Sequence, residues 1–478
     1  MKHGDERTSR VLRATASRRG VGERRAALAA LLTSMLAAGS AFAEDVVPKA
    51  LPDRIDDVPA TRPDPFPAFD NFSWRAFIAL NWPSRLEVNH RGEPDHSKSL
   101  AAPGPRVWET FKARYEVFLR DADGRPAQPA PWASYAGRNP CGPEVDNRTK
   151  TLNSFNLYSD FHQAAFELGK FEGPLVAQNR TYTRYEVRFN RPDFRSIVDH
   201  KWFLRSELPT VEHPARFETG AIAVKAAWRI LTDRDTPAIR SRYYVVNNAR
   251  VLDVAKTREA GRPVCAVQDI ALVGFHMAIK TLYRPQWIWS SFEHIDNVPP
   301  AGDGDAREPD ARAAGVPYSY FDPSRPSGDG KLTMGPPPPP PVAPGEPPAV
   351  DPEPIQVTRV HHINARTMAM NRAYWSLPQI KGTVWGNYML VLTQWPTATL
   401  PEAPQNDGRY FPGVNPEPNT PVEVYQLPGG VNDPDQNLAN TTMETYLQDR
   451  SYSCMACHHA LSNAIGRDFV TFMELDAN

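Results

Sequence analysis

The stretch AIAVKAAWRIL, residues 221–231, decides the fold because its side chains alternate in character. One set of alternate positions is apolar throughout: Ile222, Val224, Ala226, Trp228 and Ile230. Lys225 and Arg229 fall between them. A period of two places successive side chains on opposite faces of an extended chain. The stretch therefore predicts a β-strand with one apolar face.

Three further stretches have the same period. They are TYTRYEVRF at 181–189, SRYYVVNNARVLDVA at 241–255 and IALVGFHMAIKTL at 270–282. We expect the second to be a hairpin that turns at Asn247 and Asn248. In the third, alternation sends one set of residues to one face (Val273, Phe275, Met277 and Ile279) and another set to the opposite face (Leu272, His276 and Lys280). Consecutive strands of this kind favour an antiparallel sheet.

Helices and two more strands flank this run. FDNFSWRAFIALNWP, 69–83, has helical spacing, with Asp70 or Asn71 as the N-cap and Pro83 as the stop. NARTMAMNRAYWSL, 364–377, is predicted to be helical, and 154–168 fits a helix or a strand. The stretches 384–395 and 467–475 are expected to be strands. The fold class predicted is β-rich α+β, with an antiparallel sheet core and flanking helices.

Residues 299–354 divide the chain, since they contain 17 prolines among 56 residues. Such a segment favours extended polyproline structure over regular packing. We therefore expect a leader at 1–43, a β-rich domain at 44–298, a Pro-rich linker or insertion at 299–354, and a C-terminal region at 355–478. The last region is either separate or one fold with 44–298.

The segment SYSCMACHHALSN, 451–463, contains the pattern C-x-x-C-H, which is typical of covalent haem c attachment. Two residues between the thiols let one helical turn present Cys454 and Cys457 to the two vinyl groups of haem. His458 then lies under the iron as the axial ligand. A redox dithiol and a zinc site that also uses His459 are the alternatives. We expect one covalent haem c per chain, in a C-terminal attachment segment.

The N-terminal residues predict export, which covalent haem attachment in bacteria requires. A basic stretch at 13–25 precedes an apolar stretch of 13 residues at 26–38, and SAFAED at 40–45 offers a cleavage site after Ala43. The apolar stretch is short for a membrane span. We expect a Sec-type signal peptide, with SRRG at 17–20 as the twin-arginine alternative, a periplasmic product and no integral membrane anchor.

Charge and cysteine content agree with an exported globular protein. The chain has 54 Lys and Arg against 55 Asp and Glu, so the charge balance makes nucleic acid an unexpected partner. Two cysteines remain outside the motif, Cys141 and Cys265, and an oxidising compartment favours a disulfide between them. Two unrelated buried thiols are the alternative.

The C-terminal stretch CMACHHALSNAIGRDFVTF, 454–472, resembles the end of the cytochrome P460 and c′-beta group, which implies a β-rich haem protein. Four segments resemble exported bacterial proteins known as cytochrome c family: 72–83, 271–299, 384–396 and 438–458. This second resemblance implies haem c and export, and it implies no substrate.

The sixth iron ligand separates two functions. Its candidates are Met443, Met473, His276 and His294. A strong ligand predicts an electron carrier with a redox partner protein, whereas an open site predicts binding or conversion of a small molecule such as peroxide, nitric oxide or hydroxylamine. We expect a periplasmic mono-haem c-type cytochrome in electron transfer. The alternative is a haem enzyme or ligand-binding protein with an open distal site, and the sequence leaves the question of an enzyme undecided.

Overall fold

The fold is given by a computed structural model of the chain. It describes residues 66–121, 123–143, 145–152, 175–281, 284, 286–301, 308–311, 315–325, 351–395, 437–448, 450, 454, 458, 466–468 and 470. The predicted signal peptide at 1–43 and the stretch 154–168 lie outside these residues.

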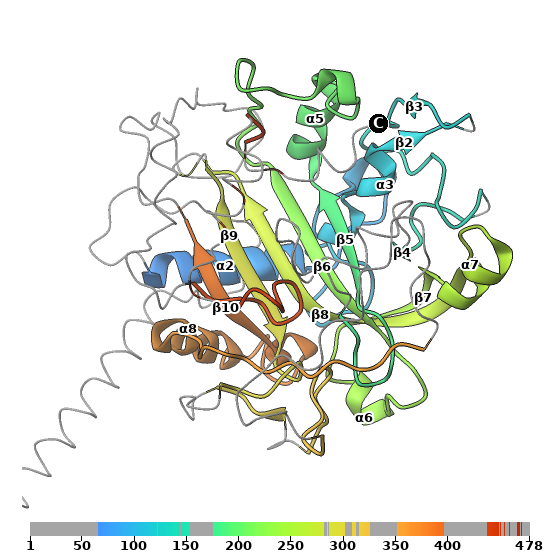
Figure 1. Cartoon of the computed structure of the whole chain (residues 1–478). Coiled ribbons are helices and arrows are strands. Elements are labelled where there is room, and N and C mark those ends of the chain that lie inside the picture. Colours follow the sequence, from blue (N-terminus) through green and yellow to red (C-terminus); the bar gives the residue numbers. More distant parts are fainter. Residues whose placement is uncertain are drawn as a thin grey trace, which may run out of the picture.

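The described part of the chain combines short helices with one large sheet (Figure 1). The α-helices are α2 (Phe66–Leu80), α3 (Arg114–Val117), α5 (Arg191–Asp199), α6 (Pro237–Arg240), α7 (Val254–Ala260) and α8 (Ala365–Trp375). The 3-10 helices are η1 (Val88–His90), η2 (Trp108–Thr110), η3 (Arg205–Glu207) and η6 (Val384–Asn387). The strands are β1 (Lys112–Ala113), β2 (Leu119–Arg120), β3 (Pro126–Ala127), β4 (Thr151–Leu152), β5 (Arg184–Phe189), β6 (Ile222–Ile230), β7 (Val245–Leu252), β8 (Cys265–Ile279), β9 (Ile288–His294) and β10 (Tyr388–Gln394).

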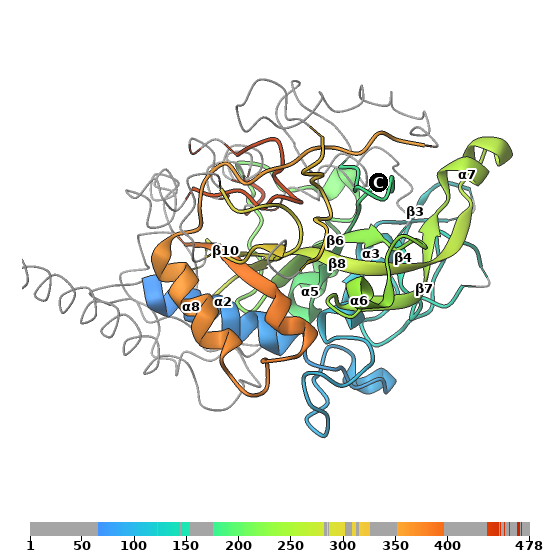
Figure 2. The same cartoon turned by 90° about the horizontal axis from the view of Figure 1, so that it is seen from below.

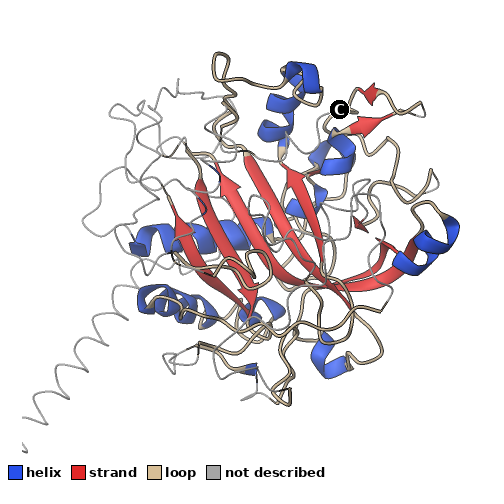
Figure 3. Ribbon diagram, viewed as in Figure 1, coloured by secondary structure: helices blue, strands red, loops and turns tan. Residues whose placement is uncertain are grey.

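The long strand β8 is the centre of the sheet (Figure 3). One edge of β8 pairs with β6, and its other edge pairs first with β7 and then with β9. β5 and β1 continue the sheet beyond β6, and β10 continues it beyond β9. These pairs are antiparallel, whereas β4 pairs with β7 in parallel. The β-rich α+β class is confirmed, and the sheet is mixed instead of wholly antiparallel.

The predicted hairpin at 241–255 is wrong, because Val245–Leu252 is the single strand β7. The pairing with β8 shifts between Val246 and Ala249, and Asn248 lies between them with a φ of 59°. Asn248 also donates its backbone N–H to the Asp269 carboxylate at 3.1 Å. The two asparagines therefore form a bulge within one strand. Asparagine readily adopts the left-handed backbone conformation, which both a bulge and a turn can contain.

The predicted faces of β8 are correct only after Val273. Phe275, Met277 and Ile279 share one apolar cluster, but Leu272 belongs to that cluster too, and Val273 lies in another. The pairing with β6 shifts here, since Ala227 pairs with Gly274 and Trp228 pairs with Leu272. The extra residue of a bulge reverses the alternation, so the strand changes faces at Val273.

Helices α2 and α8 cover one face of the sheet (Figure 2). The helix predicted from residue 69 begins at Phe66, so neither Asp70 nor Asn71 is its N-cap. Asp70 is instead buried, and it accepts hydrogen bonds from Thr367 on α8 (2.8 Å) and Thr393 on β10 (2.9 Å). One polar side chain thus joins three elements within the core.

Residues before and after the Pro-rich segment belong to one sheet, because β9 and β10 are neighbours. Parts of 299–354 are also packed. Tyr320 is fully buried and its hydroxyl lies 2.8 Å from the Thr183 hydroxyl, and the Ser319 N–H donates to the Asp296 carbonyl. The predicted linker therefore contains stretches that belong to the core, and its proline run at 336–341 lies outside the described residues.

A disulfide joins Cys141 to Cys265, the first residue of β8, with their Cα atoms 5.4 Å apart. It ties the loop around residue 141 to the central strand across a separation of 124 residues. In the described part of the chain, no helix is both long and apolar enough to cross a membrane.

Candidate functional site

The second face of the sheet, opposite α2 and α8, carries the residues that lead to the C-x-x-C-H motif. Figure 2 shows segment 437–450, in red, on this side of the sheet. We call this segment the strap. Its residues Met443 and Tyr446 pack with Tyr185, Ala271 and Val273 of the second face.

The strap approaches the sheet very closely at Gly274 on β8. A Cβ atom at this position would collide with the Thr442 hydroxyl oxygen and lie 3.4 Å from both Ala227 Cβ and Asn440 Oδ1. The Tyr185 hydroxyl donates to the Thr442 carbonyl at 2.7 Å. Gly274 is therefore required by close packing, because any side chain would push the strap outward.

Buried polar side chains fix the strap to β9. Asn440 donates to the Ser291 hydroxyl (3.1 Å) and to the Phe292 carbonyl (2.8 Å). Glu293 accepts from the Thr441 N–H (2.8 Å) and hydroxyl (3.0 Å), and it forms an ion pair with Arg359. These groups are all buried, so their bonds specify the position of the strap as well as holding it.

A second anchor lies after the motif, at Asp468. Its carboxylate forms an ion pair with Lys280 at 2.7 Å and accepts from the Phe217 N–H at 2.9 Å, while its carbonyl accepts from the Trp287 indole at 3.0 Å. Burial raises the pKa of Asp468, and the Lys280 ammonium opposes that change. The chain is thus fastened to the second face on both sides of residues 454–458.

Between the two anchors, a patch of the second face is part-exposed. The patch consists of Ala223 and Lys225 on β6, His276 and Ala278 on β8, and Trp289 on β9. Lys225 pairs with His276, Ala223 with Ala278, and Ala278 with Trp289 across the strands. The two alanines and Trp289 form one cross-strand row, and Lys225 and His276 form the adjacent row.

Of the two motif residues that the structure describes, His458 lies at this patch, and Cys454 lies at a neighbouring apolar cluster. The His458 ring lies 4.1 Å from the Trp289 ring, centroid to centroid, at an interplanar angle of 40°. Cys454 packs against a neighbouring apolar cluster that consists of Ile363, Met368, Met389, Val391, Leu392 and Leu438. Both Cys454 and His458 are part-exposed. Cys457 and His459 lie outside the described residues.

Three ionisable side chains, Glu444, His276 and Lys225, lie close together at the patch. Glu444, on the strap, lies 3.5 Å from the Nε2 atom of His276. Burial works to raise the pKa of Glu444, but His276 and then Lys225 outweigh it, and the pKa lies below its ordinary value. Burial lowers the pKa of Lys225, the Glu444 carboxylate opposes that change, and the Arg114 cation adds to it.

The donors and apolar atoms of the patch fit a c-type haem, which needs an apolar surface, an imidazole ligand and donors for its carboxylates. Trp289 Nε1 is buried with no hydrogen-bond acceptor among the described residues. His276 Nε2 makes no hydrogen bond within the described part of the chain, but the Glu444 carboxylate faces it at 3.5 Å as an ion-pair partner. A buried donor normally has a partner, so the Trp289 N–H points to an acceptor other than the described residues.

Of the three candidates for the sixth ligand that lie within the described residues, His276 alone is at this patch. The two ring nitrogens of His294 are engaged, one accepting from the Asp296 N–H and the other donating to the Arg242 carbonyl, each at 3.1 Å. Its ring also stacks on Tyr243 at 3.8 Å. Met443 is buried in the strap's apolar cluster, and Met473 lies outside the described residues.

Sequence reasoning missed Gly274, Glu444 and the anchor at Asp468. The strap has turns instead of periodic structure, so no pattern shows which of its side chains faces the sheet. A glycine within an apolar strand is a signal of close backbone approach, and it could have drawn attention to Gly274. Trp289 stands out in the sequence as part of a dense polar and aromatic stretch, although its neighbour cannot be predicted.

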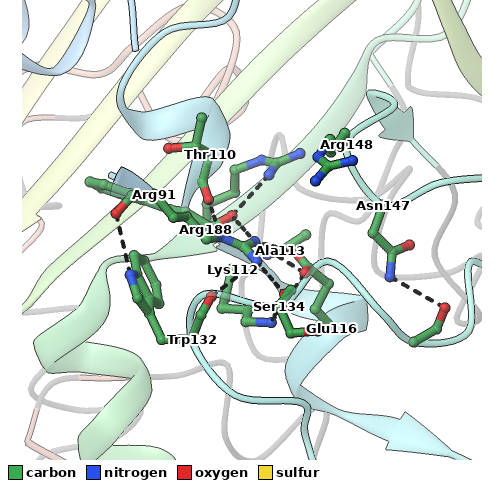
Figure 4. A network of polar contacts seen from close by, with 12 residues as sticks. Arg91, Thr110, Lys112, Ala113, Glu116, Trp132, Ser134, Asn147, Arg148 and Arg188 are labelled. Atoms are coloured by element: carbon green, nitrogen blue, oxygen red, sulfur yellow. Dashed lines mark hydrogen bonds and ion pairs between the residues drawn. The ribbon is translucent and has the colours of Figure 1, made fainter. Parts of the chain in front are cut away.

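A second polar cluster lies near β1 and β5 (Figure 4). Arg91 and Lys112 form ion pairs with Glu116 at 2.9 and 3.4 Å, and Lys112 donates to the Ser134 carbonyl at 2.8 Å. Arg188 donates to the Phe111 carbonyl at 3.0 Å. Burial lowers the pKa of Lys112 to about 8, with Glu116 opposing. These charges satisfy one another, which indicates a structural role.

Comparisons with known proteins identify no relative. Neither a family model, nor a curated protein, nor a solved structure matches this chain. Among the described residues, no group of three or more His, Cys, Asp and Glu side chains is arranged to hold a metal ion. The features of the chain that bear on its function are therefore the motif and the geometry of the second face.

Proposed function

We propose that this chain is a periplasmic mono-haem c-type cytochrome that acts in electron transfer. The observation that carries the proposal is the pair of anchors around the motif. Gly274, Asn440 and Glu293 fix the chain before Cys454, and Lys280 and Trp287 fix it after His458. A C-x-x-C-H segment held in this way over a part-exposed patch of a rigid sheet is a preorganised attachment site.

Each residue of the site then has a defined role. Cys454 and Cys457 would hold the haem through thioether bonds, and His458 would be the axial iron ligand. Trp289, packed against the His458 ring, would orient the imidazole. The apolar cluster beside Cys454 would shield the attached edge from water. When bound, the haem supplies an iron that changes between its ferrous and ferric states.

Haem staining of the denatured protein tests the proposal, after expression in a host that exports and attaches haem c. The wild-type chain should keep its haem on a denaturing gel, and Cys454→Ala or Cys457→Ala should each weaken retention. Cys141→Ser is the matched control, because Cys141 pairs with Cys265 outside the motif. Complete loss of haem from the wild-type chain on denaturation would refute the proposal.

A second candidate function is conversion or binding of a small molecule at an open distal site. The group of His276, Glu444 and Lys225 favours it, because an imidazole beside a carboxylate can accept or donate a proton. This group lies at the same patch as Trp289, next to the proposed axial ligand.

Carbon monoxide binding separates the two functions. An open site predicts a high-spin ferrous spectrum that changes rapidly with carbon monoxide, whereas a carrier with a strong sixth ligand predicts a low-spin spectrum that does not change. If the wild type is low-spin, His276→Ala should convert it to a form that binds carbon monoxide. Insensitivity of the low-spin spectrum to this change would exclude His276 as the ligand.

A further inference from the structure

Asp193 has a buried carboxyl group without a hydrogen-bond partner in the described part of the chain. Its side chain is fully buried, and both carboxyl oxygens lack a donor there. By contrast, the buried carboxylates of Glu116, Asp235 and Asp296 each accept a hydrogen bond from an arginine. Leaving a buried polar group without a partner is costly, so this exception needs a physical reason.

The local partner that this carboxyl would ordinarily have is already occupied. Asp193 is the third residue of α5, and its backbone N–H donates to the side chain of the N-cap, Asn190, at 3.2 Å. In a capping box, an acid at the third position accepts in return from the backbone N–H of the N-cap. Here that N–H donates to the Ile222 carbonyl at the start of β6, at 3.0 Å. The carboxyl of Asp193 is therefore left without a local donor.

An apolar environment and a second carboxylate both act on Asp193. Its neighbour Phe194 belongs to an apolar cluster with Phe217, Trp287 and Val470. Burial raises the pKa of Asp193 well above its ordinary value, and the negative charge of Asp468 raises it further. The folded chain therefore retains the proton of Asp193 in a range of pH where the unfolded chain has lost it.

The other charges on the surrounding elements are paired or lie at the surface. Lys280 pairs with Asp468 at 2.7 Å, and Lys112 pairs with Glu116 at 3.4 Å. Arg195 of α5 pairs with Glu218. The remaining charges of these elements are exposed or part-exposed: Arg191, Asp199, Arg216 and Arg467. An ionised Asp193 would therefore be a second buried carboxylate beside the single pair of Asp468 and Lys280.

We propose that Asp193 controls the second anchor through its protonation state: the protonated side chain leaves Asp468 docked on the sheet, and the ionised side chain releases it. On ionisation the proton passes to the solvent, and two carboxylates then face Lys280. Asp468 fastens the chain after the motif, so its release frees that end of the C-x-x-C-H segment while the strap still holds the other end. This device acts on the polypeptide alone and goes beyond the proposed function.

Native-state hydrogen exchange measures the release at two amides that the anchor protects. The Ala215 N–H donates to the Gly466 carbonyl (2.7 Å), and the Phe217 N–H donates to the Asp468 carboxylate (2.9 Å). Between about pH 4, the ordinary pKa of Asp, and the raised pKa of Asp193, the docked form binds one proton more than the released form. The protection factors of both amides should therefore fall by up to about tenfold per pH unit as the pH rises through this window.

Two variants of Asp193 remove the ionisation in different ways. Asp193→Asn keeps the shape of the protonated carboxyl, and Asp193→Leu replaces it with an apolar side chain. Each should abolish the dependence of the protection factors on pH and leave both amides better protected than in the wild type at the alkaline end. Asp199→Asn is the matched control, because Asp199 is an exposed acid on the same helix, and it should leave the dependence unchanged.

A dependence on pH that persists in both Asp193 variants would overturn the proposal, and so would constant protection factors in the wild type. A carbon-13 resonance of the Asp193 carboxyl that titrates near pH 4 in the folded chain would overturn it as well. The same dependence is expected when Cys454 and Cys457 are both replaced with Ala. Failure of haem attachment would therefore contradict the proposed function and leave this test intact.

Discussion

Gly274→Ala tests whether the strap is held by close contact with the sheet. The new Cβ would collide with the Thr442 hydroxyl, while Asn440 Oδ1 would lie 3.4 Å away. Overpacking of this kind costs about 1–3 kcal/mol. If the strap moves outward, the two hydrogen bonds of Asn440 are lost as well, at about 0.5–1.5 kcal/mol each. We expect the free energy of unfolding to fall by about 2–6 kcal/mol.

Urea denaturation followed by tryptophan fluorescence measures this change in the chain with Cys454 and Cys457 replaced by Ala, where haem does not quench the signal. Gly386→Ala is the control, since its Cβ would lie 3.4 Å from the Ile380 carbonyl oxygen and collide with nothing. Thr442→Ala removes the colliding hydroxyl, so Gly274→Ala should cost less in its presence. Additive effects, or a neutral Gly274→Ala, would refute the reasoning.

Three further predictions follow from buried groups. Arg359→Met leaves Glu293 and Glu308 without their shared cation, so it should lower the free energy of unfolding by about 3–5 kcal/mol in a denaturation experiment. Arg148→Met removes an exposed ion pair and should lower it by under about 1 kcal/mol. Equal effects of the two substitutions would contradict this prediction. Burial lowers the pKa of His294 to about 4, so the unfolded chain binds the extra proton first, and stability should fall by about 3 kcal/mol as the pH drops from about 6.5 to 4. His294→Asn should flatten this slope, and a parent chain with no such slope would show that His294 is not buried and neutral. Replacing Cys141 and Cys265 with Ser removes a disulfide that spans 124 residues of sequence, which frees the unfolded chain. The free energy of unfolding should fall by up to about 5 kcal/mol on the chain-entropy argument. An unchanged urea midpoint would show that other contacts hold the loop.

The strands of the sheet could be predicted because one apolar face repeats with a period of two. β5, β6 and β10 lie within the stretches expected, and β6 presents the expected face to the core. The helix predicted within 69–83 from its apolar spacing corresponds to α2 at 66–80, and the helix predicted at 364–377 corresponds to α8 at 365–375.

The predictions of secondary structure are wrong where a single residue departs from the pattern of its neighbours. Asn248 places a bulge in β7, where the sequence favoured a turn, and the bulge at Val273 reverses the faces of β8. Asp70 was expected to cap α2, but partners on α8 and β10 draw it into the core. Each outcome depends on residues far away in the chain, which local propensity does not contain.

The candidate site was likewise predictable from the sequence only in part. The C-x-x-C-H motif is local, so the sequence alone predicts Cys454, Cys457 and His458. The patch is not local, because Lys225, His276 and Trp289 come from three strands and Glu444 from the strap. Only the register of the sheet brings them together, and no spacing in the sequence encodes that register.

The most direct test of the central claim is an intact-mass measurement on the denatured protein, purified from the periplasm of a host that attaches haem c. We predict a chain that begins at Glu44 and carries the added mass of one haem. That added mass should disappear when Cys454 and Cys457 are both replaced with Ala. A chain with the mass of the polypeptide alone, from a host that loads other c-type cytochromes, would contradict the account.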